Sequence, residues 1–167
     1  MNLRAERVSI DVAGTLVLGV HWTPTFHRQG RSAEVAADLD AVCELRDRQG
    51  RLLELVGPLR LHNANSSVLH TGDSRIGAGS WDDERLFVFV DALPENVASV
   101  VLSVESSNGH AFGDITDACC HVTDCALEEK LLSVRLAQLG ATTGHVIATL
   151  ERHPRGWTLT SPFMERG

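Results

Sequence analysis

The sequence predicts an all-β protein, a two-sheet β-sandwich of about ten short strands with at most one or two short helical turns. Apolar residues recur mostly at every second position, which is the period of a strand with one buried face. Glycine, proline and asparagine separate the apolar segments at short intervals. Many short strands with few helices form a sandwich or a barrel. With 167 residues, 43% of them hydrophobic, the chain is expected to form a single domain over residues 1–167.

The first half of the chain holds five of the expected strands. Apolar residues recur at every second position in the first three, whereas the fifth is almost continuously apolar, as is typical of a strand buried on both faces. A turn at residues 47–50 joins the third and fourth strands into a hairpin. These strands are predicted over residues 8–12, 16–22, 39–45, 51–56 and 86–90.

The second half holds five more strands and two segments with helical character. Residues 93–99 have room for one helical turn near Pro94. Residues 127–139 carry an apolar stripe at helical spacing, but we prefer a strand for the second half of this segment. Residues 61–83 are expected to be one long irregular segment, which is usually functional or disordered. The strands of this half are predicted over residues 99–105, 115–122, 131–136, 144–151 and 157–161.

Composition narrows the classes of function. The formal net charge of −7 argues against nucleic acid as the main partner. No apolar run approaches the roughly 20 residues that span a bilayer, and the first seven residues lack the apolar core of a signal peptide. Four cysteines in a chain of this length do not resemble a disulfide framework. We therefore expect a cytoplasmic protein with reduced cysteines that does not itself span a membrane.

Six carboxylates account for nearly all of the excess negative charge. Removing these six from the 22 acidic residues leaves 16, against 15 lysines and arginines. The acidity therefore belongs to two short segments, and carboxylates gathered in this way indicate a cation site, although solvated acidic loops are also common. The six are Asp38, Asp40, Asp73, Asp82, Asp83 and Glu84.

The first acidic segment is Asp38-Leu39-Asp40. In a strand, the two aspartates project from one face and Leu39 from the other. Because Leu39 continues an apolar row, the aspartates are expected on the exposed side or at the edge of the strand. Like charges placed side by side repel each other unless a cation lies between them. The alternative is a pair of solvated acids at the start of a strand.

The second acidic segment, residues 71–84, combines four carboxylates with three glycines. Calcium takes 6–8 oxygen ligands from carboxylates, backbone carbonyls and water, and glycines allow the backbone to turn its carbonyls inward. Zinc and copper prefer histidine and cysteine, and magnesium keeps more of its water, so the composition favours calcium. The spacing does not fit an EF-hand. The alternative is an acidic surface loop.

Taken in order, these motifs resemble those of the TerD family of tellurium-resistance proteins. The resemblance extends over about residues 8–159, and the combination is specific although each motif alone is weak. It is carried by Leu18-Gly19-Val20-His21-Trp22, Asp38-Leu39-Asp40-Ala41, the loop Thr71–Glu84, Val90-Asp91-Ala92-Leu93-Pro94, Ala111-Phe112-Gly113, and Leu150-Glu151-Arg152-His153 followed by Gly156-Trp157.

The resemblance implies a β-sandwich that holds calcium between its two acidic motifs. Family members are associated with resistance to tellurite and to wider chemical and phage stress, and membrane-linked complexes have been proposed for them. Ser74, Ser80 and Trp81 depart from the family loop and remove one carboxylate, which implies an altered calcium stoichiometry. The implied calcium ligands are Asp38, Asp40, Asp73, Asp82, Asp83 and Glu84, with backbone carbonyls around Gly77 and Gly79.

Other reactive side chains suggest less specific roles. The run Cys119-Cys120-His121, with Cys125, lacks the second ligand pair of a structural zinc site, so buried core cysteines are the simpler interpretation. His62, His70 and His110 are expected at the surface. The sequence contains no nucleophile elbow, P-loop or dinucleotide fingerprint.

The leading hypothesis is a calcium-binding module that acts by binding or scaffolding rather than by catalysis. Its expected partners are other proteins of a stress-response or membrane-associated complex. The alternatives are a hydrolase that uses the same carboxylates with magnesium or manganese, and a calcium-dependent lectin-like domain.

Overall fold

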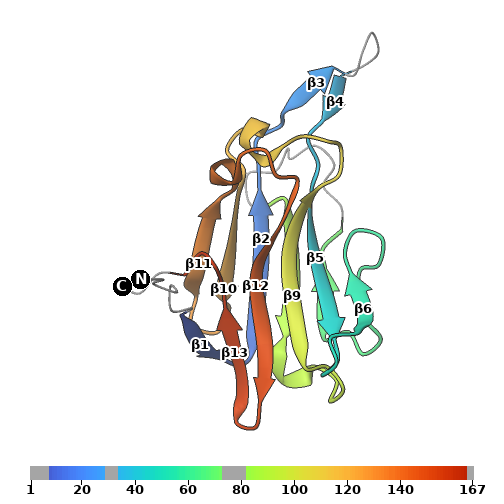
Figure 1. Cartoon of the computed structure of the whole chain (residues 1–167), viewed down its shortest axis with the longest axis vertical. Coiled ribbons are helices and arrows are strands. Elements are labelled where there is room, and N and C mark those ends of the chain that lie inside the picture. Colours follow the sequence, from blue (N-terminus) through green and yellow to red (C-terminus); the bar gives the residue numbers. More distant parts are fainter. Residues whose placement is uncertain (1–7, 29–33, 73–81, 165–167) are drawn as a thin grey trace, which may run out of the picture.

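The computed structural model describes residues 8–28, 34–72 and 82–164 (Figure 1). Within these ranges the chain is all-β, as the sequence predicts. The strands are β1 (Ser9–Val12), β2 (Thr15–His21), β3 (Phe26–Arg28), β4 (Glu34–Ala36), β5 (Leu39–Arg46), β6 (Leu52–Val56), β7 (Val68–His70), β8 (Glu84–Phe89), β9 (Ser99–Ser106), β10 (Cys119–Asp124), β11 (Glu129–Arg135), β12 (Gly144–His153) and β13 (Gly156–Thr160). Three short 3-10 helices, η1 (Val90–Ala92), η2 (Phe112–Asp114) and η3 (Leu136–Leu139), complete the described elements.

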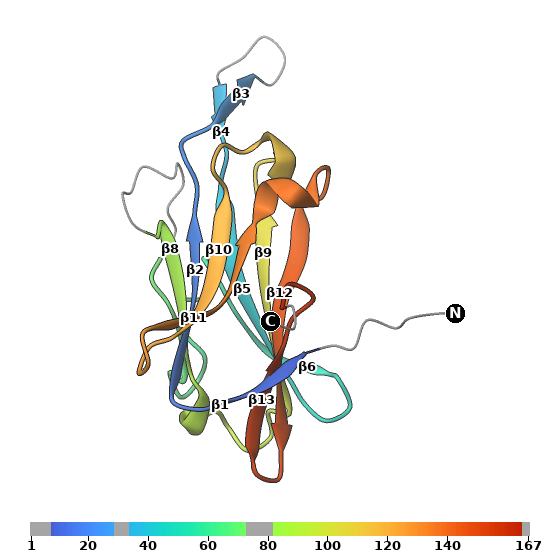
Figure 2. The ribbon, with the colours of Figure 1, turned by 90° about the vertical axis from the view of Figure 1, so that its left-hand side faces the viewer.

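Two antiparallel sheets pack face to face. The six-stranded sheet has the order β1-β13-β12-β9-β5-β6, and the five-stranded sheet has the order β11-β10-β2-β8-β7. Seen from the side, β8 and β2 of the second sheet lie to the left of β9 and β12 of the first (Figure 2). The short strands β3 and β4 pair with each other and extend beyond one end of the sandwich (Figures 1 and 2).

Alternating side chains from both sheets fill the space between them. In β5, Leu39, Ala41, Cys43 and Leu45 are fully buried, as their spacing predicts. Trp22 and Trp157 are also buried, as expected. Because the sequence has few aromatic residues, valine and leucine supply most of this core.

Each of the ten predicted strands has a counterpart in the structure, and the preference for a strand within residues 127–139 is confirmed by β11, which η3 follows. Three further strands were not predicted. β3 and β4 are three residues each and pair only with each other, and β7 lies within residues 61–83, which we expected to be irregular. Strands of this length carry too few alternating positions to produce a periodic signal.

Two boundaries also differ from the prediction. The strand expected from residue 115 begins only at Cys119, because η2 and a turn occupy the preceding residues. The helical turn expected at residues 93–99 is instead a tight turn in which Val97 N–H donates to the Pro94 carbonyl, and η1 precedes it. No helix in the described part of the chain is long and apolar enough to cross a membrane.

Three strand ends meet at the end of the sandwich from which β3 and β4 project (Figure 1). β5 and β8 begin there, and β2 ends there, paired with the first residues of β8. The acidic motifs immediately precede or open β5 and β8. The antiparallel topology therefore brings residues about 40 positions apart to the same end of the molecule.

Candidate metal centre

Asp38 and Asp40 lie at the start of β5, and both are only 8% exposed. We expected them on the exposed side or at a strand edge, and the expectation of exposure is wrong. Ser107, which follows β9, covers this position: its hydroxyl donates to Asp40 Oδ2, and its backbone N–H donates to the Asp38 carbonyl over 2.9 Å. A chain turn that follows a distant strand is not visible in the local pattern, so the sequence does not reveal this cover.

Glu84 opens β8 and is fully buried. Its side chain belongs to the same inward-facing row as Leu86 and Val88, so the strand period directs a carboxylate into the interior. Glu84 Oε2 accepts a hydrogen bond of 3.0 Å from the backbone N–H of Ala41. β6 pairs with β5 only from Cys43 onward, so at Ala41 the edge of β5 is open on that side and the glutamate occupies it.

Asp38, Asp40 and Glu84 each offer a carboxylate oxygen, and these three oxygens lie within 4.8 Å of one another. Calcium–oxygen bonds measure about 2.3–2.6 Å, so two ligands on opposite sides of one calcium ion are separated by about 5 Å. The spacing therefore fits a single cation held between the carboxylates. The donors are all oxygen, which suits calcium, magnesium or manganese rather than zinc or copper. These three buried carboxylates are thus able to hold a metal ion, and two of them come from one sheet and one from the other.

His70 lies beside this cluster. Its Nε2 is 3.3 Å from Glu84 Oε2, and its Nδ1 accepts a hydrogen bond of 2.9 Å from the backbone N–H of Gly72. Both His70 and His110 are buried, with 6% and 5% exposure, so the expectation that they lie at the surface is wrong. His70 ends β7, the strand that the sequence did not reveal, and its burial was therefore not predictable.

Asp83 and Asp82 point toward other partners. Asp83 Oδ2 accepts a hydrogen bond of 2.9 Å from the backbone N–H of Trp22 and lies 3.0 Å from Nδ1 of His21. The Asp82 carboxylate lies 2.8 and 3.0 Å from His121 Nε2. The three consecutive acids 82–84 therefore each face a histidine from a different strand, an arrangement that the sequence analysis missed because no local pattern links these histidines to the acidic loop.

Gly19 makes the Asp82–His121 pair possible. A Cβ atom added at this position would lie 2.3 Å from His121 Nε2 and 2.4 Å from Asp82 Oδ2. These distances are too short for any side chain, so the pair lies directly over the backbone of β2. The glycine in the Leu18–Trp22 motif thus has a packing role that ties β2 to the end of the acidic loop.

The remaining predicted ligands, Asp73, Gly77 and Gly79, lie outside the described residues. Calcium ligation by Asp82 and Asp83 stays a prediction, as does ligation by these three.

The cysteines form no comparable cluster within the described residues. All four are free thiols. Cys43 and Cys120 are buried core residues, as expected, and burial raises the pKa of Cys120 to about 12 and that of Cys43 further. Buried, protonated thiols are poor metal ligands and poor nucleophiles.

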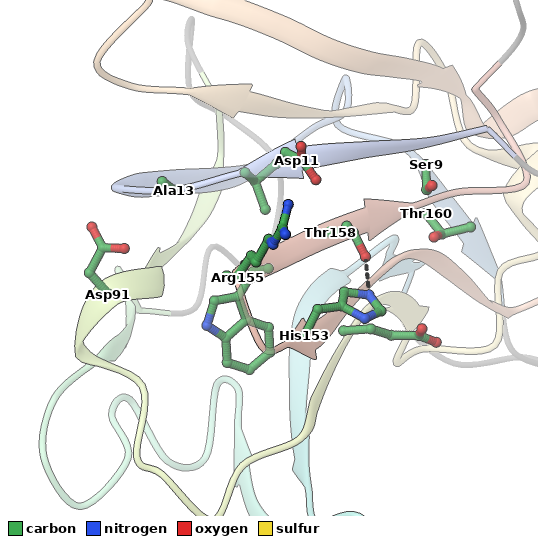
Figure 3. A pocket seen from close by; sticks show the side chains of 12 residues that line it. Ser9, Asp11, Ala13, Asp91, His153, Arg155, Thr158 and Thr160 are labelled. Atoms are coloured by element: carbon green, nitrogen blue, oxygen red, sulfur yellow. Dashed lines mark hydrogen bonds between the residues drawn. The ribbon is translucent and has the colours of Figure 1, made fainter.

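A pocket of about 780 Å³ lies at the opposite end of the sandwich and does not include the predicted ligands (Figure 3). Asp11, Arg155 and the His153–Thr158 pair, joined by a hydrogen bond of 2.8 Å, line it. Its charged side chains include both acidic and basic groups. The cluster at the other end has the more specific chemistry.

Comparison with known proteins finds relatives of similar sequence and fold. Residues 4–161 match the family model of the TerD domain. Tellurium resistance protein TerZ of Serratia marcescens is 36% identical over 124 residues, which are 74% of this chain but only 64% of TerZ. General stress protein 16U of Bacillus subtilis (strain 168) is 27% identical over 154 residues, 87% of this chain and 78% of that protein. The crystal structure of a homologue of telluride resistance protein TerD from Streptomyces coelicolor A3(2) superposes with a TM-score of 0.77 at 17% identity, covering 93% of this chain and 92% of that one, and it shows the shared fold.

Proposed function

Because the chain belongs to the TerD family, as its motifs predict, we propose that it is a calcium-binding module of the tellurium-resistance and stress-response type. The observation that carries the proposal is the group of three buried carboxylates, Asp38, Asp40 and Glu84. Three ionised carboxylates held this close repel strongly, and a divalent cation between them removes that repulsion.

Calcium fits the donor set better than other divalent ions. Six to eight oxygens are needed, and the cluster supplies three from buried side chains. The acidic loop would supply the others, with Asp73 and the carbonyls around Gly77 and Gly79 as candidates. The variable coordination of calcium suits such a mixed set of carboxylates and carbonyls better than the strict octahedron of magnesium.

A binding or scaffolding role follows from the position of the cluster. Asp38 and Asp40 belong to one sheet and Glu84 to the other, so a bound cation would fix the two sheets relative to each other at the end where the β3–β4 arm emerges. Buried ligands that come from both halves of the sandwich favour a structural role for the cation over a catalytic one. We further propose that the partners are other proteins of a stress-response complex, in the cytoplasm.

The test is to compare the protein before and after treatment with EGTA. Native mass spectrometry should show calcium bound to the untreated or recalcified protein and lost on chelation. Calcium at 100 times its Kd stabilises the folded state by about 2.7 kcal/mol, which for a chain of this length raises the Tm by about 5–10 °C.

Asp40→Asn should abolish both effects, whereas Asp114→Asn, at an exposed position in η2, should preserve them. An unchanged Tm in excess calcium, together with no calcium adduct, would refute the proposal. Manganese-dependent release of p-nitrophenol from p-nitrophenyl phosphate that Asp40→Asn abolishes would instead support the hydrolase alternative.

A further inference from the structure

A groove on the outer face of the six-stranded sheet begins at the carboxylate cluster and runs toward β6. It has a volume of about 500 Å³, and Asp38, Asp40 and Ser107 lie at one end of it. Leu55 of β6 and the turn at residues 57–60 form the opposite wall. The groove therefore joins two kinds of chemistry, carboxylates at one end and leucines at the other.

The leucine side of the groove comes from a segment that is rich in exposed leucines. Eight large hydrophobic side chains are exposed among the described residues, and five of them lie within residues 52–61. Leu55 and Leu59 of this group line the groove, and exposed apolar side chains gathered at a groove are typical of an interaction site. The five are Leu52, Leu53, Leu55, Leu59 and Leu61.

Leu59 is held in its exposed position by a rigid turn. Gly57 and Arg60 exchange two backbone hydrogen bonds, of 2.9 and 3.2 Å, so Leu59 occupies the tip of a closed turn. An ion pair of 2.6 Å between Arg60 and Glu54 fastens this turn to β6. A fully exposed leucine on a fixed turn is already in position to bind, so little conformational entropy is lost when a partner covers it.

The charges that line the groove indicate which kind of segment it can bind. Arg60 is the only basic side chain among the described residues that line the groove, and it is paired with Glu54. Glu44 is paired with Arg46 at 2.7 Å. Glu105, which lies directly opposite Asp40 in the neighbouring strand, adds a further carboxylate to the open end. A divalent cation in the cluster would leave the Glu105 carboxylate in place, so this end of the groove stays acidic with or without calcium.

We propose that this groove binds a partner protein through a segment that combines basic and apolar side chains. The basic side chains would lie against the Glu105 end, and an apolar side chain would lie between Leu55 and Leu59. The proposal rests on the proposed function, because it names the surface and the partner chemistry of a binding module. An anionic headgroup fits less well, because the open end of the groove repels it.

The test uses three fluorescein-labelled octapeptides, in which lysine alternates with leucine, glutamate with leucine, or lysine with serine. Fluorescence anisotropy is measured in calcium and in EGTA. The lysine–leucine peptide should bind in both buffers, and the other two should bind at least about tenfold more weakly, since each lacks one of the two complementary features.

Two variants and two matched controls assign the binding to the groove. Leu59→Ser and Glu105→Gln should each weaken binding of the lysine–leucine peptide, the former by about tenfold. Leu127→Ser and Glu129→Gln, at exposed positions away from the groove, should bind it like the unmodified chain. Equal binding of all three peptides, or an unchanged affinity in Leu59→Ser, would overturn the proposal.

The other occupants and the calcium site are distinguished in the same experiment. Sedimentation that shows a dimer which Leu59→Ser dissociates, without peptide binding, would assign the groove to a second copy and overturn the proposal. Co-sedimentation with phosphatidylserine vesicles that Leu59→Ser abolishes would do the same in favour of a membrane. The Tm shift with calcium should persist in Leu59→Ser, so a failure of peptide binding alongside a normal shift refutes the groove only, and peptide binding without a shift refutes the calcium site only.

Discussion

Replacing Glu84 with glutamine is predicted to affect stability in opposite directions with and without calcium. In the calcium-free protein, Glu84→Gln removes one of three carboxylates that lie close together in the interior. The free energy of unfolding should therefore increase. In the presence of calcium the same change removes a charged ligand, so the stabilisation by the cation should disappear.

The magnitude follows from the distances. Two ionised carboxylates 4.8 Å apart repel by about 3–4 kcal/mol at an effective dielectric constant of ~20, and Glu84 is this close or closer to both Asp38 and Asp40. Against this, the variant weakens the hydrogen bond from Ala41 and loses the charge contact with His70, at about 1.5–3 kcal/mol each. We expect a net gain of about 1–3 kcal/mol without calcium.

The assay is urea denaturation of the two proteins in EGTA and in calcium, with Asp114→Asn as the control for loss of one negative charge. The expected result is a higher midpoint for Glu84→Gln than for the unmodified chain in EGTA, and a lower one in calcium. If Glu84→Gln lowers the midpoint in EGTA and the calcium-dependent increase survives, the three carboxylates neither repel one another nor share a cation.

Three further predictions concern packing and titration. Gly19→Ala should displace the His121–Asp82 pair and lower the free energy of unfolding, measured by urea denaturation, by about 1–3 kcal/mol. The control Gly144→Ala should be nearly neutral, because its Cβ would meet only Glu105 Cγ at 3.8 Å. Equal effects of the two substitutions would contradict the close approach at Gly19. Arg152→Ala should lower the free energy of unfolding by about 2–4 kcal/mol, because the guanidinium stacks 4.4 Å from the centre of the Trp157 ring and donates to the carbonyls of Val97 and Pro94. Tryptophan fluorescence during urea denaturation measures this loss, and a loss below about 0.5 kcal/mol would contradict the prediction. Burial raises the pKa of Cys120 from 9.0 to about 12, so between these pH values the folded state keeps a proton that the unfolded state loses. The free energy of unfolding should be unaffected below pH 9 and should fall by up to about 1.4 kcal/mol per pH unit as the pH rises toward 12. The fall should be shallower in Cys120→Ala, and equal slopes in both proteins would refute this assignment.

The sandwich was predictable because its longer strands alternate. β5 and β9 each place apolar residues at every second position, and the spacing alone identifies their buried face. β8 is almost continuously apolar and was expected to be buried on both faces, but of its apolar residues only Leu86 and Val88 are fully buried, whereas Phe87 and Phe89 are half-buried. The same rule fails for β3, β4 and β7, since three residues hold at most two positions of one face. It also fails for the order of strands in the sheets, which depends on contacts between distant segments rather than on local period.

Three members of the carboxylate cluster could be named from the sequence, but their environment could not. Composition and the family resemblance identify Asp38, Asp40 and Glu84, which the structure brings together. Their burial was not predictable, because Ser107 and Ala41 meet them only through the tertiary fold. The partners of Asp82 and Asp83 were missed for the same reason: His121 and His21 lie on strands that no local pattern connects to the acidic loop.

The contact between Glu84 and Ala41 spans 43 residues of chain and connects the two sheets. A cation shared by the carboxylates at this point would act as a cross-link, and closing a loop of that length in the unfolded chain corresponds to about 4 kcal/mol in the entropy model used for disulfides. The four thiols of this protein are all free, so it has no permanent bridge of that kind. The stability of this end would instead depend on the concentration of the ion, so the cross-link between the two sheets would be reversible.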